Sequence, residues 1–174
     1  SALDGLSDVK YGGTDFTGSL KIGSATTGTL SSANYNVLIG NDVAEGMTDA
    51  AYNTAVGYQA LEDLAGADNN TAVGYQAGRN ITSGFSNVIV GAYAGNAIST
   101  SWSNTMVGQG AGRYSTGTGN VFLGMQAGKG GTNPHAGNSN TAVGYDALSE
   151  MNSGSNNNSA FGYGAGDEIT TGDN

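Results

Sequence analysis

The chain has 174 residues and a net charge of −9, with 14 acidic residues, 5 basic residues and no cysteine. This balance disfavours nucleic acid as a partner, because phosphate binding requires clustered Lys and Arg. The lack of cysteine excludes disulfides and cysteine metal sites. No apolar run approaches the ~18 residues of a membrane span, so we expect no membrane insertion.

Residues 1–18 do not share the pattern that follows them. We expect this segment to cap the first structural repeat or to join it to a preceding segment. The reason is that the open end of a repeat array presents unpaired strand groups that favour aggregation.

A short phrase recurs through residues 19–174. Asn53–Ala60 returns as Asn70–Ala77, and degenerate copies start at Asn36, Asn87, Asn104, Asn120, Asn140 and Asn158. The starts lie 17, 17, 17, 17, 16, 20 and 18 residues apart, and a weaker copy ends at Gly23. Scarce large apolar residues and high charge are typical of disorder, but their periodic placement argues against it. The period predicts an all-β, parallel β-solenoid of about nine turns.

Each copy predicts a short strand with two apolar faces. The third residue after the repeat Asn is always large and apolar, so we expect this strand-end column to point into the coil. The second residue, the strand-centre column, is also apolar, and successive strand residues face opposite sides. One face therefore needs a second cover, most simply the same strand of identical chains around a symmetry axis.

The strand-end residue is followed in every copy by Gly, which suits a backbone bend with positive φ or a close approach between chains. Three residues further on, a column of mostly Ala suits a narrow interior at a second strand. The remaining positions are polar and predict surface turns. The predicted structural core is Val56, Gly57, Val73, Gly74, Val90, Gly91, Val107, Gly108, Leu123, Gly124, Val143 and Gly144.

Three basic residues share one offset in the repeat, the charge column. They are Arg79, Arg113 and Lys129, and Glu62 holds the same offset one copy before Arg79. Equal offsets should stack, so Glu62 should lie over Arg79. The interpretation we favour is a solvated charge ladder of small energetic value. The alternative is a basic stripe that grips acidic glycans.

Aromatic residues also recur at equal offsets. Phe85 and Trp102 are 17 residues apart and should stack near a polar turn, with Tyr52 one position away in an earlier copy. The interpretation we favour is that they pack on the turn of the next repeat or fill the junction of a trimer. The alternative is that they stack on a sugar ring. Tyr58, Tyr75, Tyr145 and Tyr163 share another offset and predict a structural ladder at a seam between chains.

The sequence contains no convincing catalytic motif. We expect no catalytic residues, no cofactor and no bound metal. His135 is the single histidine, and its Gly/Pro/Asn loop predicts a solvated side chain. Asp42, Glu45 and Asp49 are a poor match to a Ca²⁺ loop. The paired carboxylates Glu62–Asp63 and Asp167–Glu168 keep a glycan depolymerase open as an alternative.

The phrase Asn70-Thr71-Ala72-Val73-Gly74-Tyr75-Gln76-Ala77 resembles the repeats of bacteriophage tail fibres, especially the long fibres of marine cyanobacterial phages. Leu3–Val9 resembles a lead-in of such fibres. Val56-Gly57-Tyr58-Gln59-Ala60 is more distantly similar to the head coils of trimeric autotransporter adhesins. The resemblance covers residues 19–166 and implies a left-handed parallel β-roll assembled as a homotrimer.

The same resemblance implies a structural and host-attachment segment, outside the cell on a virion tail fibre. Its expected partners are further copies of itself, other fibre or tail proteins, and a host cell-surface glycan or protein. The candidate receptor-binding surface is Arg79, Phe85, Trp102, Arg113, Tyr114 and Lys129. A bacterial surface adhesin or a self-assembling extracellular filament is the alternative to a phage fibre.

Overall fold

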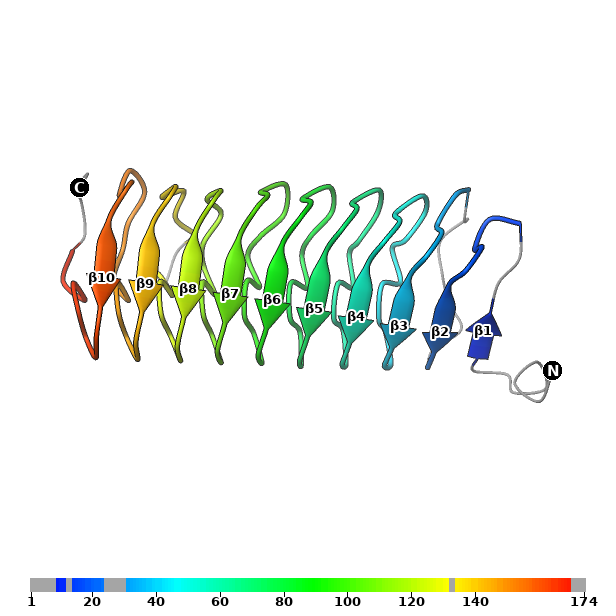
Figure 1. Cartoon of the computed structure of the whole chain (residues 1–174), viewed down its shortest axis with the longest axis horizontal. Helices are drawn as coiled ribbons and strands as arrows, with labels where there is room; N and C mark the ends of the chain where they lie inside the picture. Colours follow the sequence, from blue (N-terminus) through cyan, green and yellow to red (C-terminus); the bar gives the residue numbers. More distant parts are fainter. Residues whose placement is uncertain (1–8, 12–13, 24–30, 132–133, 170–174) are drawn as a thin grey trace.

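The computed structural model describes residues 9–11, 14–23, 31–131 and 134–169, and Leu3–Asp8 of the lead-in lies outside them. The described residues form one sheet of ten three-residue strands in chain order, which runs the length of a rod (Figure 1). The strands are β1 (Val9–Tyr11), β2 (Leu20–Ile22), β3 (Val37–Ile39), β4 (Thr54–Val56), β5 (Thr71–Val73), β6 (Val88–Val90), β7 (Thr105–Val107), β8 (Val121–Leu123), β9 (Thr141–Val143) and β10 (Ser159–Phe161).

Strands β2 to β10 are parallel and pair repeat on repeat without a shift of register. Val56 of β4, for example, lies beside Ile39 of β3 and Val73 of β5. Nine parallel strands joined by eight turns of chain confirm the parallel β-solenoid. The prediction of a second strand in each repeat is wrong for the described residues, because the Ala column lies in a turn.

The prediction of which strand face points inward is also wrong. The strand-centre column is the buried one: Leu38, Ala55, Ala72, Ile89, Met106, Phe122, Ala142 and Ala160. The strand-end column points outward, so Val56, Val73, Val90, Leu123 and Val143 are only half-buried, and Val107 is 37% exposed. In a three-residue strand the first and third residues share a face, so only the middle residue enters the narrow coil.

Two turn positions complete the core. The Ala column is buried as expected, with Val43, Ala60 and Ala77 fully inaccessible. A second core column, eleven residues after the repeat Asn, was missed by the sequence analysis, which assigned these positions to polar turns. Its members Met47, Leu64, Ile81, Ile98 and Met151 are fully buried. They face the strand-centre column and give the thin coil its large apolar side chains.

The repeat asparagines form a buried ladder along the coil. The Asn87 side-chain oxygen accepts hydrogen bonds from the backbone N of Asn104 at 3.0 Å and from its side-chain Nδ2 at 3.1 Å. The Asn87 Nδ2 donates across the coil to the Ser101 carbonyl at 3.0 Å. The bond from the backbone N of one Asn to the side-chain oxygen of the previous Asn recurs from Asn36 to Asn158. The asparagine side chains therefore join each repeat to the next. This use of backbone and amide groups explains why the position is polar yet buried.

The Gly column has the predicted positive φ, but its close approach differs from the predicted one between chains. Gly91 has a φ of +130°, and a Cβ there would lie 2.5 Å from the Gly108 carbonyl oxygen of the next repeat. The close approach is therefore between repeats of one chain.

At the N-terminal end, β1 pairs antiparallel with β2 and ends the parallel stack on that side. Phe16 is buried in the first turn, and Lys21 occupies the strand-centre column, where its Nζ donates to the Val43 carbonyl at 2.8 Å. The described residues 9–11 and 14–23 thus close the first coil with an antiparallel strand, a buried ring and a buried amine.

Candidate functional site

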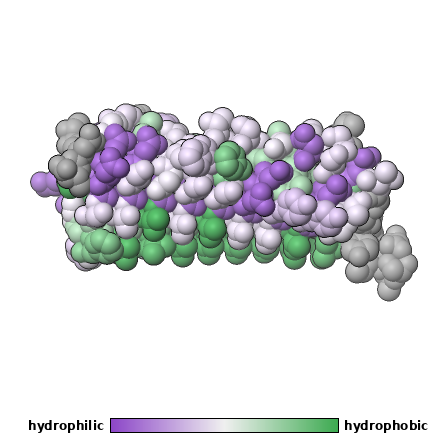
Figure 2. All heavy atoms as spheres, turned by 45° about the horizontal axis from the view of Figure 1, so that its top comes forward, coloured by the Kyte–Doolittle hydropathy of each residue, from purple (hydrophilic) through white to green (hydrophobic). Residues whose placement is uncertain are grey.

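The outward face of the sheet is an apolar strip. It carries the strand-end column, including Ile22, Ile39 and Phe161, with Val37 and Val88 beside it. Figure 2 shows these strands as a row of apolar residues along one side of the rod, while the turn surfaces are mostly polar. Val88 is 42% exposed and Phe161 70% exposed, so the single chain leaves this strip uncovered.

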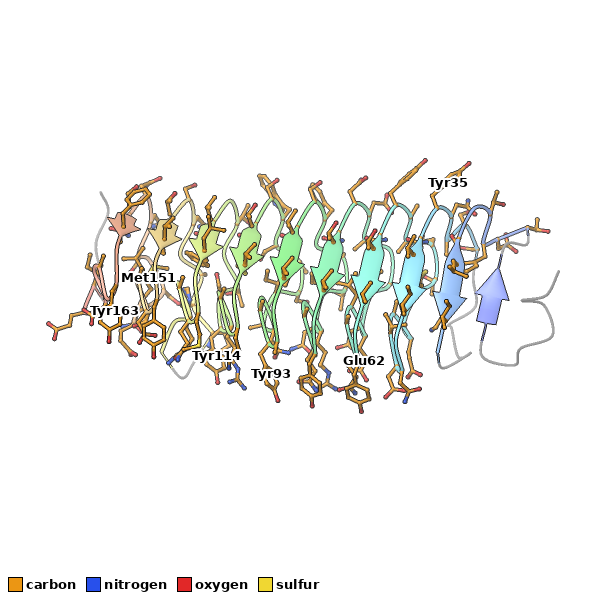
Figure 3. All side chains as sticks on the ribbon, turned by 60° about the horizontal axis from the view of Figure 1, so that its bottom comes forward. Tyr35, Glu62, Tyr93, Tyr114, Met151 and Tyr163 are labelled. Atoms are coloured by element: carbon orange, nitrogen blue, oxygen red, sulfur yellow. The ribbon has the colours of Figure 1, made fainter. Side chains whose placement is uncertain are left out.

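The edge at which the strands begin, the strand-start edge, carries exposed aromatic pairs. Phe85 and Trp102 stack with ring centroids 5.8 Å apart and planes 5° apart, which confirms the predicted stacking. Tyr52 stacks instead on Tyr35 at 5.2 Å, and Tyr35 marks this edge in Figure 3. All four rings are about half exposed. Their edges therefore reach solvent, while the paired faces are covered by each other.

The opposite edge, the strand-end edge, carries tyrosines. Tyr58 stacks on Tyr75 at 5.5 Å and Tyr145 on Tyr163 at 5.3 Å, which confirms the predicted stacking of these rings. Their place at a seam between chains stays a prediction. Tyr93 meets Tyr75 edge-on at 5.1 Å, and the hydrogen bond between their side chains raises the pKa of Tyr75.

The charge column lies on the strand-end edge as well. Arg79 Nε forms the predicted ion pair with Glu62 Oε2, and this hydrogen bond raises the pKa of Arg79. Glu62 also accepts a hydrogen bond from Gln59 Nε2 at 2.9 Å. Lys129 Nζ donates to Gln126 Oε1 at 3.2 Å. Two of the three cations are thus held by neighbouring side chains.

Arg113 differs from its column neighbours. Its guanidinium carbon lies 4.5 Å from the centre of the Tyr93 ring and 5.3 Å from that of Tyr114. Its Nε is buried, and within the described part of the chain it has no hydrogen-bond partner. The structure therefore brings Arg113, Tyr114 and Lys129 together, and places Phe85 and Trp102 on the other edge of the sheet.

His135 is not solvated, so that prediction is wrong. It is only 2% exposed, pairs through its backbone with Ser115 of the previous repeat, and its ring packs on Gly130. Ser115 occupies the second core column, and neither its hydroxyl nor the two His135 ring nitrogens have a hydrogen-bond partner among the described residues. Burial lowers the pKa of His135, and the nearby Gly128 backbone only partly opposes this. The longest repeat, of 20 residues, thus buries His135 beside Ser115 inside the coil.

Acid should therefore loosen this part of the rod. With its folded-state pKa lowered, His135 takes up its proton more readily in the unfolded chain, so stability is highest above pH ~6.5 and falls as the pH drops below it. We expect the melting temperature of the wild type to fall by about 2–4 °C more between pH 7 and pH 5 than that of His135→Met. Methionine is a suitable replacement because Met47 and Met151 are fully buried in the second core column, where His135 pairs with Ser115. Circular dichroism melts at both pH values provide the measurement, and parallel losses in the two proteins would contradict the prediction.

The described residues hold no group of three or more His, Asp or Glu side chains arranged to bind a metal ion. The weak Ca²⁺ alternative at Asp42, Glu45 and Asp49 is therefore not supported. Within the same ranges, no helix has the length and apolar character needed to cross a membrane.

No protein-family model matches the chain, and neither a curated protein nor a solved structure shows significant similarity to it.

Proposed function

We propose that this chain is a structural and host-attachment segment of a phage tail fibre, displayed outside the cell on the virion. In this proposal three chains associate as a left-handed β-roll homotrimer, join other fibre or tail proteins, and present their turns to a cell-surface glycan or protein. The chain acts by rigid display, without catalysis, cofactor or metal.

The observation that carries the proposal is the uncovered apolar strip. A large apolar residue faces outward in every parallel strand, from Ile22 to Phe161. Covering apolar surface stabilises an assembly by about 25 cal/mol per Å², and the contribution recurs in nine strands. Unbroken exposed apolar surface is typical of interaction sites. The number of three chains comes from the resemblance to phage fibres and adhesin heads.

The position of the strip also suits display. With the sheet face turned toward a symmetry axis, both edges of the sheet remain at the outside, including the aromatic pairs and the charge column. Many weak contacts along one rod then add through effective concentration. Glu62, the first candidate of the depolymerase alternative, is held by Arg79 and Gln59, which favours a structural role for it.

The assembly prediction is a particle mass near three times the 17.3 kDa of the chain, measured by sedimentation with light scattering. Val107→Lys places a charge at the centre of the strip and should yield monomers that keep their β-sheet circular dichroism. The matched control, Asn80→Lys, places the same charge on an exposed turn and should keep the wild-type mass. A wild type that stays monomeric with intact β signal would overturn the homotrimer.

The attachment function is tested separately, with fluorescently labelled protein and a panel of marine cyanobacterial strains. We expect saturable labelling of some strains, measured by flow cytometry, and competition by unlabelled protein. Labelling of no bacterial strain would contradict host attachment. Labelling of surfaces other than bacterial cells would favour the adhesin alternative.

A further inference from the structure

The Arg113 side chain is positioned by aromatic rings and has no carboxylate partner among the described residues. Its guanidinium lies against the rings of Tyr93 and Tyr114, with distances of 4.5 Å and 5.3 Å to the ring centres. Figure 3 places both tyrosines on the strand-end edge of the rod. Aromatic faces attract and orient a guanidinium but do not neutralise its charge. The buried Nε, without a partner in the described residues, leaves a donor unused.

Arg79 provides the comparison within the same column. It is the same residue type at the same offset, and Glu62 satisfies it as an ion pair. The described residues contain no carboxylate within ion-pair distance of Arg113. The charge column therefore provides a carboxylate partner for Arg79 from a neighbouring repeat. It provides none for Arg113 among the described residues.

Lys129 adds a second positive charge beside Arg113. It follows Arg113 in the charge column, and the backbone N of Tyr114 donates to the Lys129 carbonyl at 2.9 Å, which fixes the two repeats side by side. Lys129 has Gln126 as its side-chain partner, a neutral group. Two neighbouring cations repel each other, in a chain whose net charge is −9. An anion from outside would relieve this repulsion.

The geometry points to a carboxylate-binding site on the strand-end edge, formed by Arg113 and Lys129 with Tyr93 and Tyr114 beside them, for an acidic saccharide. This inference rests on the proposed function and names the chemical class of the receptor. A guanidinium presents a planar fork that matches a carboxylate, and neighbouring phenol rings and hydroxyls suit a sugar ring. A long polyanion such as nucleic acid is disfavoured, because only two cations meet here on an acidic rod.

The test measures binding of trigalacturonate, and of its neutral methyl ester, to the assembled protein by titration calorimetry. A charged hydrogen-bonded pair contributes about 1.5–3 kcal/mol, so Arg113→Gln should weaken trigalacturonate binding by about ten-fold or more. Arg113→Lys keeps the charge but loses the fork and should give an intermediate loss. The matched control Arg79→Gln should leave the affinity within about two-fold, because its part-buried ion pair with Glu62 is separate from the proposed ligand site. Circular dichroism verifies the fold of each variant.

Equal binding of acid and ester, equal losses in Arg113→Gln and Arg79→Gln, or no binding of trigalacturonate would each overturn the site. The attachment assay separates this result from the proposed function. Cell labelling that persists without trigalacturonate binding leaves the fibre function standing and removes the inference. Trigalacturonate binding that depends on Arg113, without labelling of any strain, supports the site and removes the proposed function.

Discussion

Gly91→Ala is expected to destabilise the solenoid by about 4 kcal/mol, one of the largest effects available to a single methyl group. The residue has a φ of +130°, which an L side chain rarely adopts, and the added Cβ would lie 2.5 Å from the Gly108 carbonyl oxygen and 2.6 Å from its carbon. Both atoms belong to backbone, so neither moves without disturbing the strand register. The melting temperature, followed by circular dichroism, should fall by about 8–16 °C.

Gly162 provides a control that separates the backbone strain of a positive φ from steric overlap with the next repeat. Gly162 has a similar φ of +123°, but a Cβ there would meet no atom within 4 Å. Gly162→Ala therefore carries the backbone strain alone and should cost about 1–3 kcal/mol. If the two variants lose the same stability, close stacking of the repeats does not explain the Gly column.

Removing one rung of the asparagine ladder should have a comparable effect. Asn87→Ala deprives the Asn104 backbone N and the Ser101 carbonyl of their partners, at 3.0 Å each, inside a fully buried coil. Each buried polar group left unsatisfied costs about 1–3 kcal/mol, so we expect a loss of about 3–5 kcal/mol. Denaturant unfolding, followed by circular dichroism, measures the loss.

Asn87→Ser is the matched variant, because Ser19 fills this position in the first repeat. Its hydroxyl accepts from the Asn36 backbone N at 2.8 Å and donates to the Ala33 carbonyl at 3.1 Å. We therefore expect Asn87→Ser to lose less than half of the free energy of unfolding that Asn87→Ala loses. Equal losses for Ala and Ser would mean that side-chain volume, rather than the hydrogen bonds, accounts for the asparagine column.

The two edges of the sheet divide the candidate surface. Phe85 and Trp102 lie on the strand-start edge. They stack on each other, so one face of each ring is covered by the other ring. Arg113 lies against Tyr93 and Tyr114, which Figure 3 labels on the strand-end edge, and the backbone N of Tyr114 donates to the Lys129 carbonyl. A single small ligand therefore does not touch both groups, and variants on one edge should leave binding at the other unchanged.

The sequence by itself determined the repeat, its parallel in-register stacking and several contacts that depend on equal offsets. Arg79 with Glu62, Phe85 with Trp102 and the tyrosine pairs were predicted because a solenoid places equal positions above one another. The Gly column was predicted because only glycine combines a positive φ with close backbone approach.

Only the tertiary structure decided which apolar face points inward. Both strand columns are apolar, so their polarity does not distinguish them, and the constant size of the strand-end column suggested the core. The coil instead buries the column of variable size. Phe122 packs against Gly112 and Gly128, whereas the repeat of Ala55 also buries the larger Leu64. His135 entered the core because the interval of 20 residues breaks the offset rule that placed the other contacts. Arg113 was distinguished from Arg79 only by its neighbours in space, which differ from repeat to repeat while the offset stays the same.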